Sequence, residues 1–310
     1  MDVDGKRVIN RGPALNLYRS LVDNDTWLRG SWFDSGLSQI TPHVRSMKAR
    51  GVSDRAVSVD VELDCIGFKG AGFRHHATYT VLADGSIVCD NNLTPVGNLP
   101  PLPRIGVRMF VAPGYENLKW LGRGPSESYP DRKTSCDVGL YSGKVADQYV
   151  MYVRPQENGA KEDVRWASLT DGTGAGLLMV TEEPMSMTVS HNTSEDLSEL
   201  RHAQGERRKY RARIPRAEVV VCLDARQMGL GGASCGPRPL DKYICRGVST
   251  SFRYVLRPYR KAMGPLADVA RQVAPLALAP TVARGDDGLV TLGSSTPGAV
   301  IRYTLDGSTG

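Results

Sequence analysis

Apolar and polar residues alternate along much of the chain. In VSVDVELDC (57–65) every second residue is apolar, which predicts a strand with one face toward water. ATYTVLADGSIVCDN (77–91) predicts two strands joined at residues 83–86, where Asp84-Gly85 favours a type I′ turn. The same pattern predicts further strands at 105–112, 148–155, 176–182, 186–192, 217–225 and 250–258.

Helical periodicity is scarce by comparison. It predicts short helices at 266–274 and 194–203, the second with Ser194 as its N-cap and acidic residues in its first turn. The 33 glycines and 19 prolines indicate many turns. The chain is therefore predicted to be all-β, with antiparallel strands in two sheets packed face to face.

The pattern divides the chain into three parts. Residues 1–258 carry the strands of one domain, and residues 259–279 mix Pro and Ala with the short helix, which predicts a linker. Residues 280–310 begin a new β pattern, but three short strands cannot bury a core of their own. We therefore expect this module to be truncated or to lean on the first domain, and the sequence to be a fragment.

Composition narrows the class of protein. An apolar fraction of 41% and a charged fraction of 23% are typical of a soluble globular protein. No apolar run approaches the ~18 residues that a membrane span needs. The N-terminus lacks the hydrophobic segment of a signal peptide. We expect no membrane partner, and the localisation stays open between cytoplasm and export.

Cysteine, histidine and charge patterns exclude other classes. Six Cys without a CxxC pair and five His lack the spacing of a zinc site, and buried reduced thiols are favoured over disulfides. Much of the net charge of +6 lies at 201–216, a stretch that suits either a phosphate backbone or a solvated strand pair. Pro215, Glu206 and the lack of a nucleic-acid motif favour the strand pair, so no nucleic-acid partner is expected.

A set of motifs carries a resemblance to a known family. In chain order they are LNLYRSLVDND (15–25), PRIG (103–106), WLGRGPSESYPDR (120–132), PQENG (155–159) with DVRW (163–166), and MGLGGASCGP (228–237). Over about residues 5–258 the chain resembles the C-terminal domain (domain 5) of family 2 β-galactosidases. The same region is also found as the separate small chain of two-chain β-galactosidases.

The resemblance implies a fold, a function and partners. The fold is a β-supersandwich of the galactose mutarotase-like type, which packs against a catalytic barrel and forms one wall of the substrate pocket. The whole enzyme hydrolyses terminal β-D-galactosides. The implied partners are the barrel domain or large chain, carbohydrate, and further copies in an oligomer, with no cofactor in this chain. The tail VTLGSSTPGAVIRYTLDGST (290–309) is similar to the first half of a small chitobiase C-terminal β-sandwich module.

The resemblance also implies that the catalytic residues lie elsewhere. Retaining glycosidases need two carboxyl groups roughly 5 Å apart, and in this family both come from the barrel. Glu127 and Glu157 are the obvious acidic residues here, but their flanks favour loop-forming roles, with Asn158 at the tip of a turn. We therefore predict no catalytic pair, and we name Tyr129, Glu157 and Asn158 as candidates for the pocket wall.

The loop GLGGASCGPRP (229–239) is the other candidate for carbohydrate contact. In some relatives the corresponding loop carries a Trp that stacks on the sugar ring, and alignment on Gly231-Gly232 places Gly236 at that position. The stacking platform is therefore not carried over. We expect the loop to approach the pocket through Ser234, Cys235 or Arg238.

Two further groups have a functional and a structural interpretation. Asp23-Asn24-Asp25 could bind a cation, although adjacent acceptors more often cap turns. Among the tryptophans, Trp120 and Trp166 are predicted to fill the core, whereas Trp27 and Trp32 are predicted to be exposed or at the barrel interface.

Three functions fit these observations. The first is a non-catalytic but obligatory part of a β-galactosidase. The second is a stand-alone carbohydrate-binding module, and the third is a structural domain that self-associates through an apolar patch.

Overall fold

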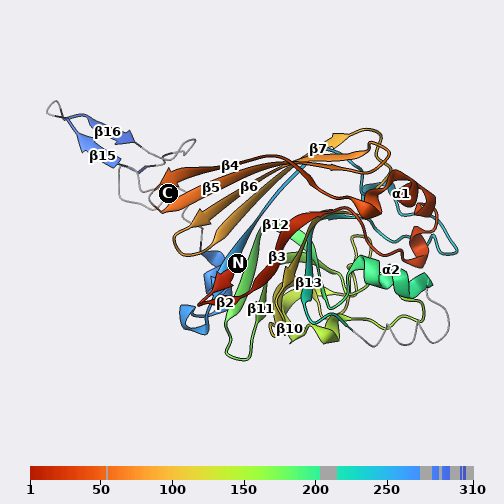
Figure 1. The fold of residues 1–310 in the computed structure, drawn as a ribbon. Coiled ribbons are helices and arrows are strands. Elements are labelled where there is room, and N and C mark those ends of the chain that lie inside the picture. Colours follow the sequence, from red (N-terminus) through yellow and green to blue (C-terminus); the bar gives the residue numbers. More distant parts are fainter. Residues whose placement is uncertain are drawn as a thin grey trace.

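Most strands of the protein form one large antiparallel sheet. The computed structural model describes residues 1–53, 55–202, 215–272, 281–285, 288–293, 301 and 303–304, without the side chains of 199–202. Twelve strands join in a single sheet (Figure 1), which confirms the all-β class. They are β3 (Ile9–Asn16), β4 (His43–Ser53), β5 (Ala56–Ile66), β6 (Gly72–Leu82), β7 (Ile87–Val96), β8 (Arg104–Val111), β9 (Asn117–Gly124), β10 (Asp137–Lys144), β11 (Lys161–Thr170), β12 (Gly176–Ser190), β13 (Val219–Gln227) and β14 (Thr250–Tyr259).

The remaining elements are short. Two small hairpins pair β1 (Asp2–Val3) with β2 (Lys6–Arg7), and β15 (Thr281–Arg284) with β16 (Val290–Gly293). Within the described residues the α-helices are α1 (Arg29–Ser35), α2 (Ser194–His202) and α4 (Leu266–Arg271), and the 3-10 turns are η1 (Asp23–Asp25), η2 (Leu37–Gln39), η3 (Ala146–Gln148), η4 (Asp241–Tyr243) and η5 (Lys261–Met263).

The sheet forks at its longest strand. Residues 176–181 of β12 pair with β14, from which the sheet continues through β7, β6 and β5 to β4. Residues 186–190 of β12 pair instead with β13, which leads to β8 and β3. The sequence predicted two strands here, at 176–182 and 186–192, and two packed sheets for the domain as a whole. The structure has one strand that belongs to both halves of the sheet, so the sheets are continuous.

The halves of the forked sheet share one core. Met109 of β8 and Val221 of β13 lie in the same buried cluster as Leu256 of β14 from the other half, and Leu118 of β9 and Leu169 of β11 join them. Apolar side chains on one face of each strand therefore leave water together when the sheet curls. Strands β4 to β7, which we call the wing, lie along the top of the molecule in Figure 1, and Cys89 of β7 still contributes to this core.

A second cluster lies under α1 and corrects one prediction. Trp32 was expected to be exposed, but it is completely buried beside Phe73 and Leu102, and its indole donates to the Pro101 carbonyl at 2.6 Å. The stretch around it is helical rather than a loop, so one face of α1 turns inward. The core positions predicted for Trp120 and Trp166 are confirmed.

One predicted turn type and one predicted helix cap differ from the structure. The connection between β6 and β7 has four residues, and Gly85 alone takes a left-handed φ of 82°, so the predicted type I′ turn is wrong. At the start of α2 the Thr193 hydroxyl accepts the Asp196 N–H at 3.2 Å. Ser194, the predicted cap, donates its hydroxyl to Glu157 instead.

The predicted strand at 148–155 is not a strand. Residues 149–160 run without regular structure after η3, and the Val150 N–H binds the Asn158 side-chain oxygen at 2.9 Å rather than a neighbouring strand. Alternation of β-branched and aromatic residues forms a strand only where a sheet offers a place for it. Here the alternation leaves apolar side chains in water.

The C-terminal part packs on the sheet through α4. Val269 and Ala270 are buried against Trp166, Leu178 and Tyr259. Residues 273–280 and most of 294–310 lie outside the described residues, so the domain boundaries at 258 and 279 and the truncated module stay predictions. Most of the basic stretch 201–216 also lies outside them.

Candidate functional site

The motif loops are bonded to one another, and we call residues 19–25, 127–132, 150–159 and 229–239 the motif-loop cluster. The Glu127 carboxylate accepts the Tyr152 hydroxyl and the Gly159 N–H, the latter at 2.7 Å. The Gly231 carbonyl accepts from Arg132 at 2.5 Å and from Asn24 at 2.9 Å. Segments far apart in the sequence thus form one surface of defined shape.

Glu157 sits at the buried base of this cluster. Its side chain is 4% exposed and contacts Arg104 at 2.6 Å, while the Ser20 N–H and the Ser194 hydroxyl each donate to it at 3.0 Å. The cavity beside it has a volume of about 10 Å³, room for about one water and far too small for a sugar ring. In this chain Glu157 binds protein groups and holds the loops.

A second buried carboxyl shares the same arginine. Asp224 Oδ2 lies 3.6 Å from Arg104 Nε, and both side chains are completely buried. Neither Asp224 oxygen receives a hydrogen bond from the described residues. Burial raises the pKa of Asp224 to about 7, the charge of Glu157 acts in the same direction, and Arg104 opposes them. This pair of carboxyl groups faces a guanidinium inside the protein rather than a groove.

The two other pocket-wall candidates from these loops are also buried. Tyr129 is buried, and burial holds the pKa of its hydroxyl well above the usual value. Asn158 accepts from the Val150 N–H and donates to the Gln156 carbonyl, both at 2.9 Å. Asn158 therefore holds the chain at Val150.

The loop 229–239 is anchored at its start and open at its tip. The Asp131 carboxylate accepts the N–H groups of Leu230 and Gly231 at 2.9 and 2.7 Å. The predicted contact residues lie at the tip, and all are exposed: Ser234, Cys235, Gly236 and Arg238. The Arg238 guanidinium stacks over the Trp27 ring, 4.4 Å from its centroid, so the loop tip also contacts the segment that follows residues 19–25.

Asp131→Ala is expected to loosen this loop. The variant loses an ionised acceptor for two backbone N–H groups, so amides of residues 230–236 should exchange hydrogen about tenfold faster or more. Hydrogen–deuterium exchange with peptide resolution measures this. Asp84→Ala is the matched control, because its carboxylate accepts one N–H of a different turn. Unchanged exchange at 230–236 would show that Asp131 does not anchor the loop.

An apolar segment is exposed beside the same loops. Met151 is 83% exposed and Val153 98% exposed, and Val150 and Tyr152 lie partly in water next to them. Desolvation, with the Glu127 carboxylate close by, raises the pKa of Tyr152 to about 12. Four consecutive apolar residues on a surface are typical of a contact with another protein.

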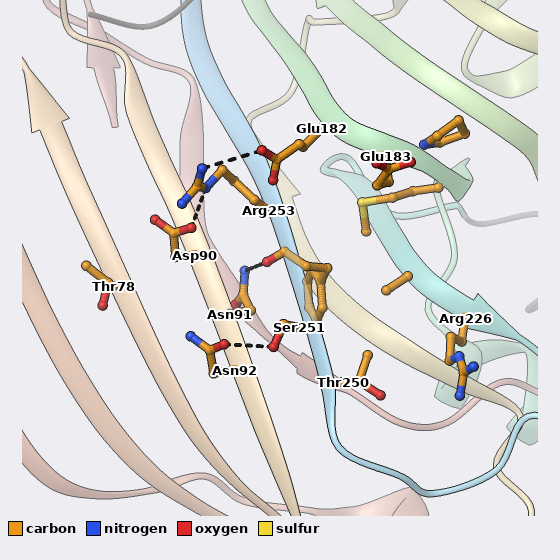
Figure 2. A pocket seen from close by; sticks show the side chains of 14 residues that line it. Thr78, Asp90, Asn91, Asn92, Glu182, Glu183, Arg226, Thr250, Ser251 and Arg253 are labelled. Atoms are coloured by element: carbon orange, nitrogen blue, oxygen red, sulfur yellow. Dashed lines mark hydrogen bonds and ion pairs between the residues drawn. The ribbon is translucent and has the colours of Figure 1, made fainter. Parts of the chain in front are cut away.

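A separate cleft lies where the sheet forks. It has a volume of about 610 Å³ and lies between residues 182–185 of β12, 225–226 of β13 and 250–253 of β14. Arg253 bridges two acidic residues there, as Figure 2 shows: it contacts Asp90 through Nε and Glu182 through Nη1 at 3.5 Å. The sequence prediction missed this cleft, because the fork brings together three strands whose patterns are unremarkable alone.

The acidic stretch Asp23-Asn24-Asp25 is engaged by groups of the protein itself. The Asp25 carboxylate accepts the Val22 N–H at 3.2 Å, which is the turn-capping role of the structural interpretation. Asp25 also forms an ion pair with Arg19 at 2.7 Å, and Asn24 binds the Gly231 carbonyl. The described residues contain no group of three or more His, Cys, Asp or Glu that could hold a metal ion. In the same part of the chain no helix has the length and apolar character needed to cross a membrane. All six cysteines are free thiols, and Cys235 alone is exposed.

Sequence reasoning missed Arg104 and Asp224. Both lie in otherwise apolar strand patterns, IGVRMFVA after Arg104 and VVVCLD up to Asp224. A charged residue at the end of a run of apolar residues is a signal for a buried ion pair. For Arg104 this signal lies inside the PRIG motif.

Comparisons with known proteins place the chain in a family. The family described as "Beta galactosidase small chain" matches residues 1–256. The chain is 30% identical to a β-galactosidase of Priestia megaterium, covering 70% of this chain and 20% of that protein. It is 29% identical to a β-galactosidase of Kluyveromyces lactis, covering 83% of this chain and 25% of that protein.

Two solved structures complete the comparison. A putative aldose 1-epimerase of Escherichia coli covers 69% of each chain with a TM-score of 0.36 and 11% identity. A GalM/aldose epimerase homologue of Caenorhabditis elegans covers 70% of this chain and 69% of that one, with a TM-score of 0.34 and 9% identity. The chain spans about a fifth to a quarter of the length of the curated relatives named above. The match to residues 1–256 shows that this chain belongs to the β-galactosidase small-chain family.

Proposed function

We propose that the chain is a non-catalytic but obligatory part of a family 2 β-galactosidase. In the whole enzyme it packs against the catalytic barrel, completes the substrate pocket and stabilises the assembly. The whole enzyme hydrolyses terminal β-D-galactosides. The observation that supports this proposal is the exposed apolar segment around Met151, beside the exposed tip of the loop 229–239.

Rigidity and exposure occur together in the motif-loop cluster. Buried ion pairs at Arg19 and Arg104 hold the loops from below, while Met151 and the loop tip remain in water. A preorganised apolar surface loses little conformational entropy when it docks, so this arrangement suits a protein interface. The relatives are long enough to supply the partner within one polypeptide, because they extend well beyond the matched region.

The chain by itself is expected to be inactive. Glu127 and Glu157, the two glutamates of the motifs, bind backbone and side-chain groups of the protein. The purified chain should not turn over a chromogenic β-galactoside, and addition of the catalytic barrel of the parent enzyme should restore turnover. Turnover by the chain alone that disappears in Glu127→Gln would contradict the proposal.

Met151→Asp is expected to weaken the association with the barrel. A charge in the centre of an apolar contact must be desolvated on docking, so we expect affinity to fall at least tenfold and activity to fall with it. Surface plasmon resonance against the immobilised barrel measures the affinity. Met47→Asp on the wing is the matched control, since Met47 is 70% exposed and lies outside the motif-loop cluster. Equal losses in both variants would contradict this docking surface.

A further inference from the structure

We propose that the cleft at the fork of the sheet is a saccharide-binding site. This role goes beyond the proposed function, because it is a binding activity of the chain itself. The cleft volume of about 610 Å³ lies within the range of small-molecule sites. It is large enough for a mono- or disaccharide.

The cleft exists because β12 changes partners along its length. The pairing with β14 stops at Thr181 opposite Tyr254, and the pairing with β13 starts at Ser186 opposite Asp224. Between these points the strands diverge, so residues 250–253 of β14 have a strand neighbour, β7, on one side only. Backbone donors and acceptors without a strand partner at this edge are therefore available to a ligand. The Phe252 carbonyl already accepts the Asn91 side-chain N–H at 3.4 Å.

Side chains around this edge are held in place by one another. Arg253 is fixed between Asp90 and Glu182, and Ser251 donates its hydroxyl to Asn92 at 2.8 Å (Figure 2). Carboxylates accept hydrogen bonds from hydroxyl groups, whereas guanidinium and amide N–H groups donate hydrogen bonds to hydroxyl oxygens. A set of fixed donors and acceptors that alternate over a short distance is what a polyhydroxylated ligand requires.

The charge balance of the cleft favours a neutral ligand. Three carboxylates line it, from Asp90, Glu182 and Glu183, against two guanidinium groups, from Arg226 and Arg253. A phosphate or another anion would meet the acidic majority, and two of those carboxylates already neutralise Arg253. A sugar carries no charge and can use both kinds of group.

The cleft also offers apolar surface of the kind that a sugar face contacts. Met185, Pro184, Ala225 and Phe252 contribute to its lining. Phe252 is half-buried, and its ring is stacked on that of Tyr254, with centroids 6.4 Å apart and planes 18° apart. The aromatic residue is therefore held firmly beside the polar groups.

An extended peptide is the competing occupant, because open strand edges can accept another strand. The open edge of β14 is only four residues long, and Pro184 on the facing strand has no N–H to donate. A peptide strand would therefore form few backbone hydrogen bonds with β14, and fewer still with the strand that carries Pro184. Hydroxyl groups need no such register, so the geometry favours a saccharide.

The test is a titration of the 310-residue chain with galactose, lactose and a galactan-derived trisaccharide. Binding is measured by calorimetry and by NMR. We expect millimolar or tighter binding of at least one sugar. Glu182→Gln and Thr250→Val should each weaken it at least tenfold, equivalent to about 1.4 kcal/mol. The Glu182 side chain is 59% exposed, so its replacement is compatible with folding. Glu62→Gln, the same change at an exposed position of β5 outside the cleft, should leave binding unchanged.

Three results would overturn the proposal. The folded chain could bind none of the sugars, or sugar binding could survive in both cleft variants. In the third, an added strand-forming peptide would displace the sugar although neither cleft variant weakens its binding. The outcome is separable from the proposed role in the assembly. Restored turnover with the barrel tests the motif-loop cluster, whereas sugar titration of the chain alone tests the fork cleft.

Discussion

Replacing Glu157 by alanine is expected to lower the free energy of unfolding by about 3–5 kcal/mol. The reason is the state of Arg104, whose guanidinium is completely buried and contacts Glu157 at 2.6 Å. Without this partner the positive charge stays inside the protein, and among the described residues its remaining acidic partner is Asp224 at 3.6 Å. The Ser20 N–H and the Ser194 hydroxyl lose their acceptor at the same time. Urea denaturation followed by circular dichroism measures the change.

Asp2→Ala serves as the control for this prediction. Asp2 also pairs with an arginine, Arg7, but both side chains are half exposed, so the loss should stay below about 1 kcal/mol. If Glu157→Ala kept wild-type stability while the assembled enzyme lost activity, Glu157 would have a functional rather than a structural role.

Asp224→Asn is expected to stabilise the protein above neutral pH and to flatten its pH profile. The pKa of Asp224 in the folded protein, about 7, lies above the ordinary value of 3.8, so folding favours the protonated form. The stability that this group contributes is therefore complete below pH 4 and is lost as the pH rises through 7. A shift of about three units corresponds to roughly 4 kcal/mol at pH well above 7. Asparagine keeps the shape of the neutral acid and cannot ionise.

The measurement compares the free energy of unfolding of the wild type and Asp224→Asn at pH 5, 6, 7 and 8. The difference between the two curves isolates Asp224 from other groups, such as buried His75, whose pKa is lowered mainly by desolvation. The variant should gain stability relative to the wild type as the pH rises. Parallel curves would mean that Asp224 is ionised throughout as a partner of Arg104.

Of the two residues in these predictions, Glu157 was singled out from the sequence and Asp224 was not. Glu157 was singled out because it lies in a specific motif, and a structural role was favoured from its flanks. That role was expected in a surface turn, whereas the side chain lies in a buried ion pair. Arg104 is 53 residues away in the chain, so no local pattern could indicate the contact.

The expectation for Glu127 came closer to the structure. Two prolines in its motif suggested an ordered loop in which a carboxylate accepts backbone N–H groups, and the Gly159 N–H does donate to it. The donor comes from the second motif loop, 32 residues later in the chain. The kind of bond was foreseeable from residue types, but the partner was not.

The sequence by itself determined the all-β class, most strand positions and the family. Alternation along β5, β6 and β14 reports which side of each strand faces water, and that information is local. The motif loops could be recognised because their Gly, Pro and acidic residues occur in a specific order.

Only the tertiary structure decided how these parts meet. It made one strand, β12, serve both halves of the sheet and opened a cleft at the fork. It also buried Trp32 and left the strand-like stretch around Met151 in water. The physical reason is the same in each case: a local pattern states which side chains prefer to leave water, whereas the partner that buries them is set by packing among segments distant in the chain.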